Sequence, residues 1–301
     1  MNPTKFTLRR SAFSPGNAIF IIDCLTELDM QTGLSRLRKL HDLLFERDPE
    51  RFEYNKNFAH RFEASSAIEF AECFEKITGA CALGIQPIIF IDAHGHSEKG
   101  LRMPSGEFVG WGKRLGHLGS VVHRTGGELT VVVAACHSMR AVENLRPQKQ
   151  LPFSFYYGYS SEVKAGVVAT ETELIYESLI NDGGKSVLSA TNLQLGHFSE
   201  YDHIEDVLAV ALLIAKAPNI LAEMLPQLSR AKLRACIDKT IVAKGHRLSG
   251  SRLKANSLLN SGQHAIEAIK QLMHDTQRRE RVIQDIQAYI QAGLTPIAED
   301  T

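Results

Sequence analysis

The sequence predicts an α/β fold with a mostly parallel sheet flanked by helices, followed by a smaller all-helical region. Two observations support this prediction. In the first two thirds of the chain, short apolar runs alternate with segments of helical periodicity, which is typical of β-α-β units. From about residue 200 onwards, only helical patterns follow. We therefore divide the chain into an α/β domain, residues 1–198, and a helical subdomain, residues 199–301.

The composition is that of a folded protein from a reducing compartment. The 301 residues include 34 basic and 34 acidic side chains, and this zero net charge argues against a nucleic-acid-binding protein. There are five cysteines, an odd number, without any Cys-x-x-Cys spacing, which argues against a disulfide framework. The longest apolar run, residues 207–215, is too short to span a membrane. These features predict a cytoplasmic protein without nucleic-acid or membrane partners.

Four apolar runs are predicted as the strands of the sheet. They cover residues 17–24, 87–94, 129–136 and 153–159. Each run is apolar at successive positions rather than at alternate ones. A strand that is buried on both faces of a parallel sheet has this pattern.

Three helical patterns lie between or after these strands. Residues 33–47 carry leucines at positions 34, 37, 40, 43 and 44, and the helix is expected to end before Pro49, because the residue preceding a proline avoids the helical conformation. Residues 65–81 begin with a capping Ser65 or Ser66 and place Ile68, Ala71, Phe74 and Ile77 on one apolar face. A third helix begins near residue 170 and is expected to end at Gly183.

The segment between the second and third strands is long and rich in glycine. Residues 95–128 are predicted to form a hairpin and a short helix, and long connections in compact domains are usually functional. Their glycines do not form a Gly-x-Gly-x-x-Gly turn between a strand and a helix, so a nucleotide site is not expected.

Reactive side chains follow two of the predicted strands. His94, Gly95 and His96 end the second strand, and Cys136 and His137 end the third. Ligands bind at the carboxyl ends of the strands in open parallel sheets, so we expect His94 and Cys136 to lie side by side. A neighbouring imidazolium stabilises the thiolate that attacks a carbonyl carbon, and the N–H groups of Gly95 and Cys136 are suited to hold the oxyanion.

These two blocks, PIIFIDAHG and LTVVVAAC, resemble the signature of the caspase-like cysteine peptidases. That group includes caspases, metacaspases, separase, clostripain and bacterial CHAT-type proteins. The segment FYYGYSSEVKAGVVATETELIYESL is similar to the next strand, pocket loop and helix of CHAT-type members, so that the resemblance covers roughly residues 15–195. It implies a caspase-like fold, with His94 as the base, Cys136 as the nucleophile, and no cofactor or metal.

The chain departs from the family at the positions that set substrate preference. Ala134 stands where metacaspases carry an aspartate, and Ala-Ala-Cys replaces the Gln-Ala-Cys of caspases. Neither the basic preference of metacaspases nor the aspartate preference of caspases is therefore expected from the motif. Glu162 and Asp23, which lie at the ends of two other strands, are candidates for an acidic substrate-binding pocket instead.

We interpret the chain as a cysteine endopeptidase that acts on protein or peptide substrates. It is expected to be latent until an activating protein partner or processing switches it on in a regulatory or defence pathway. Self-cleavage after Arg146 or Lys149 is one such processing hypothesis. The alternative is a catalytically silent caspase-fold interaction protein that works through its helical part.

Two further alternatives concern the reactive residues themselves. His96 is a second candidate for the base, because it lies two residues beyond His94. His94 and His96, together with Cys136 or His137, can also supply imidazole and thiolate ligands for zinc.

Overall fold

The structure is a computed structural model in which the described residues fall into two compact units. It describes residues 11–50, 58–125, 129–143, 145, 151–190, 192–205, 231–232, 235, 266, 269–270, 273 and 276–291. One unit is Arg9–Glu200, and the other combines Met1–Leu8 with Tyr201–Thr301. Most of the second unit, and with it most of the predicted helical subdomain, lies outside the described residues. Its α13 (Thr276–Gln291) is a helix, as expected.

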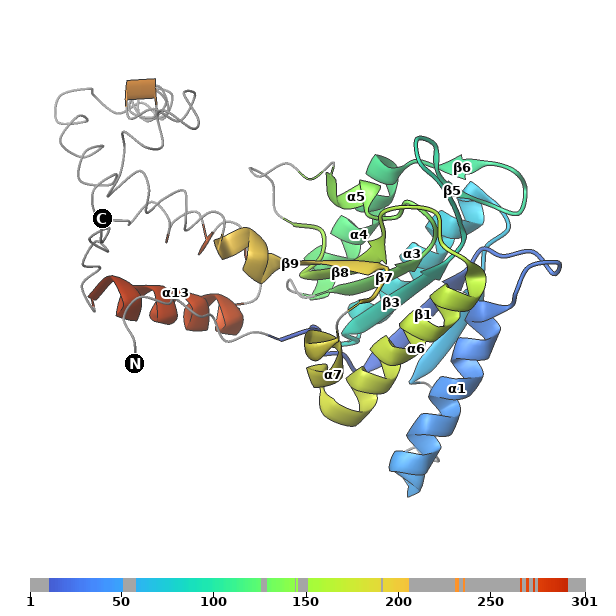
Figure 1. Ribbon diagram of the computed structural model, residues 1–301, viewed down its shortest axis with the longest axis horizontal. Helices are drawn as coiled ribbons and strands as arrows, with labels where there is room; N and C mark the ends of the chain where they lie inside the picture. Colours follow the sequence, from blue (N-terminus) through green and yellow to red (C-terminus); the bar gives the residue numbers. More distant parts are fainter. Residues whose placement is uncertain are drawn as a thin grey trace. The chain divides into compact units, whose positions relative to one another are not determined.

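The unit Arg9–Glu200 is built on a six-stranded, mostly parallel sheet (Figure 1). Its strand order is β2 (Ala59–Glu63), β1 (Ala18–Asp23), β3 (Pro87–Asp92), β7 (Thr130–Ala134), β8 (Phe155–Tyr159) and β9 (Leu195–Ser199). The first five strands of this order run parallel to one another, whereas β9 is antiparallel to β8. The predicted α/β class with a mostly parallel sheet is therefore confirmed.

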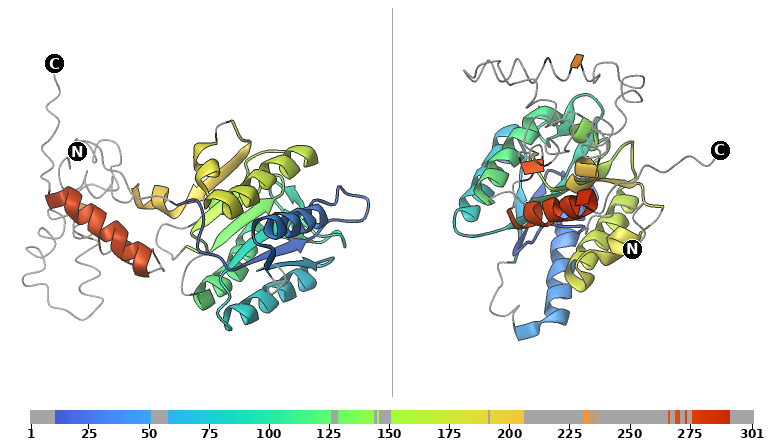
Figure 2. Two further views of the ribbon diagram at one scale, coloured as in Figure 1. Left: turned by 90° about the horizontal axis from the view of Figure 1, so that it is seen from below. Right: turned by 90° about the vertical axis from the view of Figure 1, so that its left-hand side faces the viewer.

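Helices cover both faces of this sheet (Figures 1 and 2). One face carries α1 (Thr32–Arg47), α6 (Ala165–Asp182) and α7 (Lys185–Ser189), and the other carries α3 (Ala67–Cys81), α4 (Trp111–Thr125) and α5 (Arg140–Glu143). Alternate residues of the central strands, such as Ile22, Ile91 and Val133, belong to the apolar core shared with α3 and α4. The residues between them therefore face α1 and α6, since side chains alternate along a strand.

The long segment after β3 is more regular than the sequence indicated. It forms a three-stranded antiparallel sheet of β4 (His94–His96), β5 (Gly100–Arg102) and β6 (Phe108–Val109), and then α4, which has 15 residues rather than the short helix expected. Glycines weaken an isolated helix by about 1 kcal/mol each. In α4 this cost is offset by Leu118, Val121 and Val122, which are buried in the core.

The face of α1 that meets the sheet is not the predicted leucine stripe. Of the five leucines only Leu40 is fully buried, and the buried residues are Thr32, Gly33, Arg36 and Leu40. The carboxylates at the ends of β1 and β3 explain this choice. Arg36 forms an ion pair with the buried Asp92, and a side chain at Gly33 would collide with Asp23.

The N-terminus of α3 confirms one of the two predicted caps. The Ser66 side chain accepts a hydrogen bond from the Glu69 N–H at 3.2 Å. The predicted apolar face is partly wrong, because Ile68 is 72% exposed. Phe70 and Cys73 are buried instead, beside Phe74 and Ile77.

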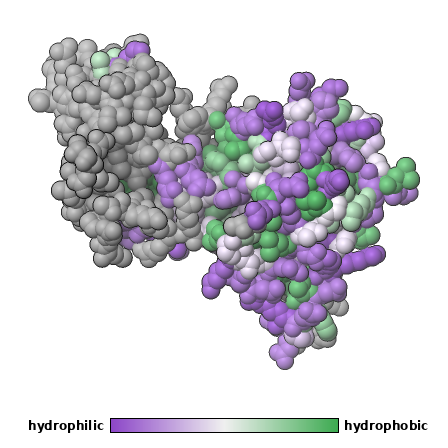
Figure 3. All heavy atoms as spheres, in the orientation of Figure 1, coloured by the Kyte–Doolittle hydropathy of each residue, from purple (hydrophilic) through white to green (hydrophobic). Residues whose placement is uncertain are grey.

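Two strands of the large sheet were not predicted, and both lie at its edges. β2 has the sequence AHRFE and β9 the sequence LGHFS, so neither has the apolar run of a central strand. Polar residues are common in edge strands, which face water on one side. Hydrophilic residues also cover much of the described surface seen in Figure 3. Within the described residues, every helix is too short or too polar to cross a lipid bilayer.

Candidate functional site

Strand register places His94 and Cys136 next to each other. Asp92, the last residue of β3, pairs with Ala134, the last residue of β7. His94 and Cys136 each lie two residues beyond this pair. Side chains alternate between the two faces along a strand. His94 and Cys136 are therefore on the same side of the sheet as Asp92 and Ala134, opposite to the core that packs against α3 and α4.

The backbones on either side of this pair are in close contact at Gly95. A Cβ atom at position 95 would lie 1.8 Å from the carbonyl oxygen of Cys136 and 3.0 Å from its nitrogen. No side chain fits in this space, so glycine is required there. The structure thus brings together the three residues predicted from the two motifs, His94, Gly95 and Cys136.

His94 and Cys136 line one cavity at the carboxyl edge of the sheet. Its volume is about 150 Å³, and its walls come from the β1–α1 loop, the ends of β3 and β7, and the start of α6. Ala134 and Val163 lie in the same lining. This is the position where ligands bind in open parallel sheets.

The Cys136 thiol is held by the backbone of Val163. Its Sγ accepts a hydrogen bond from the Val163 N–H at 3.4 Å and donates to the Val163 carbonyl at 3.6 Å. The N–H bond can form with either the thiol or the thiolate, because sulfur is the acceptor in it. The carbonyl bond, in contrast, requires the protonated thiol.

The loop that carries Cys136 is fixed to the end of β8. His137 has a positive φ of 56°, and its N–H donates to the Ser161 carbonyl at 3.1 Å. The Ser138 hydroxyl donates to the Val133 carbonyl at 3.0 Å and accepts from the Tyr159 N–H at 2.8 Å. A left-handed non-glycine conformation is costly, and residues that adopt it cluster at active sites.

This loop leaves one backbone donor available beside the sulfur. Within the described residues, no acceptor takes the Cys136 N–H. The neighbouring Gly95 pairs with Leu101 across the β4–β5 ladder, which fixes the orientation of its peptide. An available N–H on the nucleophile itself is one of the two donors that were predicted for an oxyanion.

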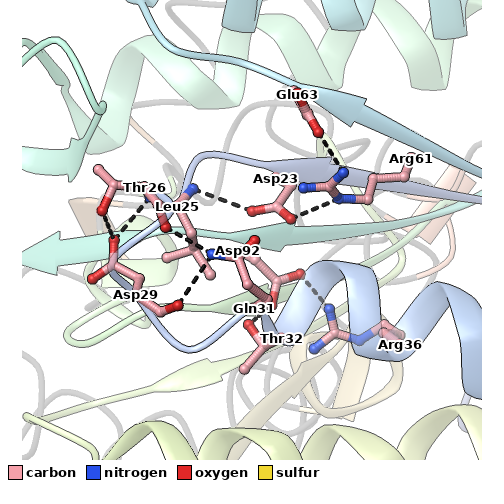
Figure 4. Close-up of polar contacts among 10 residues, drawn as sticks. All are labelled: Asp23, Leu25, Thr26, Asp29, Gln31, Thr32, Arg36, Arg61, Glu63 and Asp92. Atoms are coloured by element: carbon pink, nitrogen blue, oxygen red, sulfur yellow. Dashed lines mark hydrogen bonds and ion pairs between the residues drawn. The ribbon is translucent and has the colours of Figure 1, made fainter.

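His94 is oriented by a carboxylate that the sequence did not single out. Its Nε2 lies 2.9 Å from Oδ1 of Asp29, in the β1–α1 loop. Hydrogen bonds from the Thr26 side chain and N–H, and from His94, lower the pKa of Asp29 to about 2. Figure 4 shows the contacts with Thr26. An ionised carboxylate only accepts hydrogen bonds, so Nε2 carries a proton and Nδ1 is the basic nitrogen of the neutral ring.

His96 is engaged elsewhere. Its Nδ1 accepts hydrogen bonds from the N–H groups of Glu98 and Lys99, at 3.1 and 3.3 Å, and its ring contacts Phe108. It does not line the cavity that contains Cys136. The geometry therefore favours His94 over His96 as the base.

The two carboxylates predicted to form an acidic pocket do not line this cavity. Asp23 is buried and accepts from Arg61 Nε at 2.8 Å and from the Leu25 N–H at 3.2 Å (Figure 4). Burial raises the pKa of Asp23, although Arg61 opposes this effect. Glu162 is exposed to solvent, next to Val163.

A second buried carboxylate lies below the cavity and anchors its wall. Asp92 is completely buried, accepts from the Thr32 hydroxyl at 2.6 Å, and forms an ion pair with Arg36 (Figure 4). Arg36 also donates to Thr172 of α6 at 2.9 Å. These contacts join the sheet to α1 and α6, the two helices that frame the cavity.

The described residues do not form the zinc site that was considered from the sequence. Among the residues that the structure describes, no group of three or more histidine, cysteine, aspartate or glutamate side chains is arranged to hold a metal ion. The proposed processing positions, Arg146 and Lys149, lie outside the described residues.

Neither a scan against protein-family models nor a search of curated proteins finds a match for this chain. Its function is therefore inferred from the site itself. That site combines a cysteine whose sulfur is partly accessible, a histidine in the same cavity, a carboxylate bound to that histidine, and an available N–H at the cysteine. Together these groups are suited to acyl transfer through a thiolate.

Proposed function

We propose that the chain is a cysteine endopeptidase with a caspase-like fold. The observation that supports this proposal best is the contact of Gly95 with Cys136, within a cavity that His94 and Cys136 both line. The family resemblance requires a histidine-glycine pair at the end of one strand and a cysteine at the end of the adjacent strand, and β3 and β7 are adjacent. No described residue of the long connection between them lines the cavity.

The proposed reaction begins with the Cys136 thiolate and the protonated His94. The sulfur attacks the carbonyl carbon of the scissile bond, and the resulting oxyanion accepts hydrogen bonds from the N–H groups of Cys136 and Gly95. The C–N bond then breaks, and the His94 imidazolium gives its proton to the leaving amine. A water molecule, deprotonated by His94, hydrolyses the thioester and restores the thiol.

Asp29 has a supporting part in this scheme. Its carboxylate holds the Nε2–H of His94 and stabilises the imidazolium form of the ring. The scheme requires no metal or organic cofactor.

The resting position of the thiol supports a latent enzyme. Its hydrogen bonds, among the described residues, are with Val163 and not with a nitrogen of His94. We propose that the imidazolium already acts on the sulfur across the cavity that both residues line, and that an activating protein partner or processing moves the 161–164 segment or His94 so that the two come into direct contact. We place this activity in the cytoplasm, with the helical subdomain as the region that a partner contacts.

The proposal can be tested without a known substrate. The rate at which iodoacetamide alkylates Cys136 at pH 6 is measured by mass spectrometry in the wild type, His94→Ala and His96→Ala. We expect His94→Ala to lower this rate at least ~10-fold, because the thiolate loses its imidazolium neighbour. His96→Ala is the matched control, since it removes another exposed imidazole ring from the same hairpin.

The same experiment distinguishes the peptidase from the alternative, a silent interaction protein. Equal rates in all three proteins would mean that His94 does not activate Cys136, and the peptidase proposal would then be wrong. The silent interaction protein would be favoured instead, as the Val163 contacts of the thiol allow. That protein would keep its biological effect in Cys136→Ala, whereas a peptidase would lose it.

A further inference from the structure

We infer that the cavity beside Cys136 receives an uncharged apolar side chain, so that the enzyme cleaves after residues of the leucine, methionine and phenylalanine class. This inference rests on the proposed peptidase function and adds its substrate class. It differs from the acidic pocket that the sequence indicated.

The walls of the cavity are mainly apolar. Of the twelve residues that line it, eight are apolar, and these come from four separate parts of the chain, one of which is Ala93 after β3. Leu25 and Met30 belong to the β1–α1 loop, Ala134 to β7, and Val163 and Val168 to the segment that runs into α6. A side chain that enters beside the sulfur is therefore surrounded by hydrocarbon on most sides.

The volume of the cavity matches one medium-sized side chain. It measures about 150 Å³. An apolar cavity of roughly 150 Å³ accepts a benzene-sized group. Leucine, methionine and phenylalanine fit this space.

The carboxylates around the cavity are either already engaged in hydrogen bonds or lie outside its lining. Asp29 lines it, but both of its oxygens already accept hydrogen bonds from Thr26 and His94. Asp23, Asp92 and Glu162 do not line it. A lysine or arginine side chain that entered would lose its hydration and would have to compete with His94 and Thr26 for the Asp29 carboxylate, which is costly.

An acidic side chain meets the same difficulty. Arg36, below the cavity, is buried and already paired with Asp92. Arg102 lies opposite His94 in the β4–β5 ladder, but it is exposed and does not line the cavity. Among the described residues that line the cavity, His94 alone can carry a positive charge, and Asp29 already balances that charge.

The test uses a series of N-acetyl-tripeptidyl acyloxymethyl ketones that differ only in the residue next to the ketone. The Cys136 thiolate attacks the methylene carbon, the C–S bond forms, and the carboxylate leaves with the electrons of the broken C–O bond. The rate of Cys136 labelling is measured by mass spectrometry for leucine, methionine, phenylalanine, arginine, lysine and aspartate probes. We expect the three apolar probes to react at least ~10-fold faster than the charged ones.

One substitution should change this preference in a known direction. Ala165 is exposed, is the first residue of α6 and lines the cavity, and an acidic residue is well tolerated in the first turn of a helix. Ala165→Asp is expected to speed up the arginine and lysine probes relative to leucine at least ~10-fold. Gly166→Asp is the matched control, because it adds the same charge one residue further on, outside the lining.

The outcomes separate this inference from the proposed function. Faster labelling by arginine, lysine or aspartate probes in the wild type would overturn the apolar cavity and leave the peptidase in place. An Ala165→Asp preference identical to that of Gly166→Asp would also overturn it. If each probe labels Cys136 at the same rate in His94→Ala as in the wild type, the proposed function itself is wrong.

Discussion

At the scale of single residues, Gly95 is the position where the site tolerates least change. A Cβ atom there would meet the Cys136 carbonyl oxygen at 1.8 Å, whereas a Cβ atom at Gly79, in α3, would meet nothing within 4 Å. We expect Gly95→Ala to abolish labelling of Cys136 by acyloxymethyl ketones and to lower the thermal midpoint. Gly79→Ala should instead be neutral or stabilise the protein by up to about 1 kcal/mol, as alanine does in helices. If Gly95→Ala is labelled at the wild-type rate, the close contact between Gly95 and Cys136 is not needed for reactivity.

Asp29 links the chemistry of the site to pH. Its folded-state pKa of about 2 lies below the unfolded value of about 3.9, so its contribution to stability is complete above pH 4 and disappears as the pH falls towards 2. We expect Asp29→Asn to be less stable than the wild type at pH 7, with a difference that shrinks between pH 4 and pH 2. Urea unfolding at each pH measures this difference.

Asp182 provides the control for that experiment. Hydrogen bonds from Ser186 and Ser178 also lower its pKa to about 2, but it lies at the end of α6, at the opposite end from the cavity. Asp182→Asn should show the same pH dependence of stability and leave labelling of Cys136 unchanged. Asp29→Asn should slow labelling at least ~10-fold at pH 7, because an amide supports the wrong histidine tautomer. Equal rates of Cys136 labelling in Asp29→Asn and Asp182→Asn would mean that Asp29 does not position His94.

At the scale of elements, a buried ion pair fastens α1 to the sheet. The side chains of Arg36 and Asp92 are 2% and 0% exposed. We expect Arg36→Ala to destabilise the protein by about 3–5 kcal/mol, because it leaves a carboxylate buried without its partner. The double variant Arg36→Met, Asp92→Asn should be less destabilised than Arg36→Ala alone, since it removes both charges. Chemical denaturation measures both values.

A second ion pair on the same helix makes the comparison sharper. Lys39 pairs with Glu173 of α6, but these side chains are 46% and 28% exposed. Lys39→Ala is therefore expected to cost at most about 1 kcal/mol. A similar cost for Arg36→Ala and Lys39→Ala would mean that burial does not distinguish the two pairs.

The elements also show what the sequence could and could not predict. The central strands were predictable because burial on both faces makes them apolar throughout, and the strand-end rule then placed His94 and Cys136 together. The edge strands β2 and β9 lack that signal. The inward face of α1 depends on Asp23 and Asp92, which belong to other elements, so its own leucines were misleading.

Asp29 was missed for a different reason. It lies in a loop, where no periodicity reports which side chains turn inwards, and only its bond to His94 reveals it. The one available signal was its place shortly after β1, since loops that follow parallel strands gather at the same edge of the sheet.

At the scale of the whole molecule, the unit Arg9–Glu200 has the contacts of an independent domain. Its N-terminal segment is held against two neighbouring strands, β7 and β8, because the Ala12 carbonyl accepts from the Tyr157 hydroxyl at 2.7 Å and the Ser14 N–H donates to the Thr130 hydroxyl at 2.8 Å. We expect a protein of residues 9–200 to fold alone and to unfold cooperatively in urea.

The cysteines report on this folding. Cys24, Cys73 and Cys81 are buried, and burial raises the pKa of each thiol, that of Cys81 to about 11. We expect these three thiols to resist alkylation both in the full chain and in residues 9–200, while Cys136 reacts. A gradual unfolding curve together with rapid alkylation of all four thiols would mean that the unit depends on the rest of the chain.

The register of β3 and β7 has a consequence for how such a site can diverge. The pairing of Asp92 with Ala134 determines the side of the sheet on which His94 and Cys136 lie. Loss or gain of one residue inside either strand would therefore turn one of these side chains to the opposite face. The hairpin and helix between the strands are under no such constraint, and insertions or deletions there leave the pair aligned. Distant homologues should therefore conserve the distance from each strand to its reactive residue, while the spacing between histidine and cysteine varies freely.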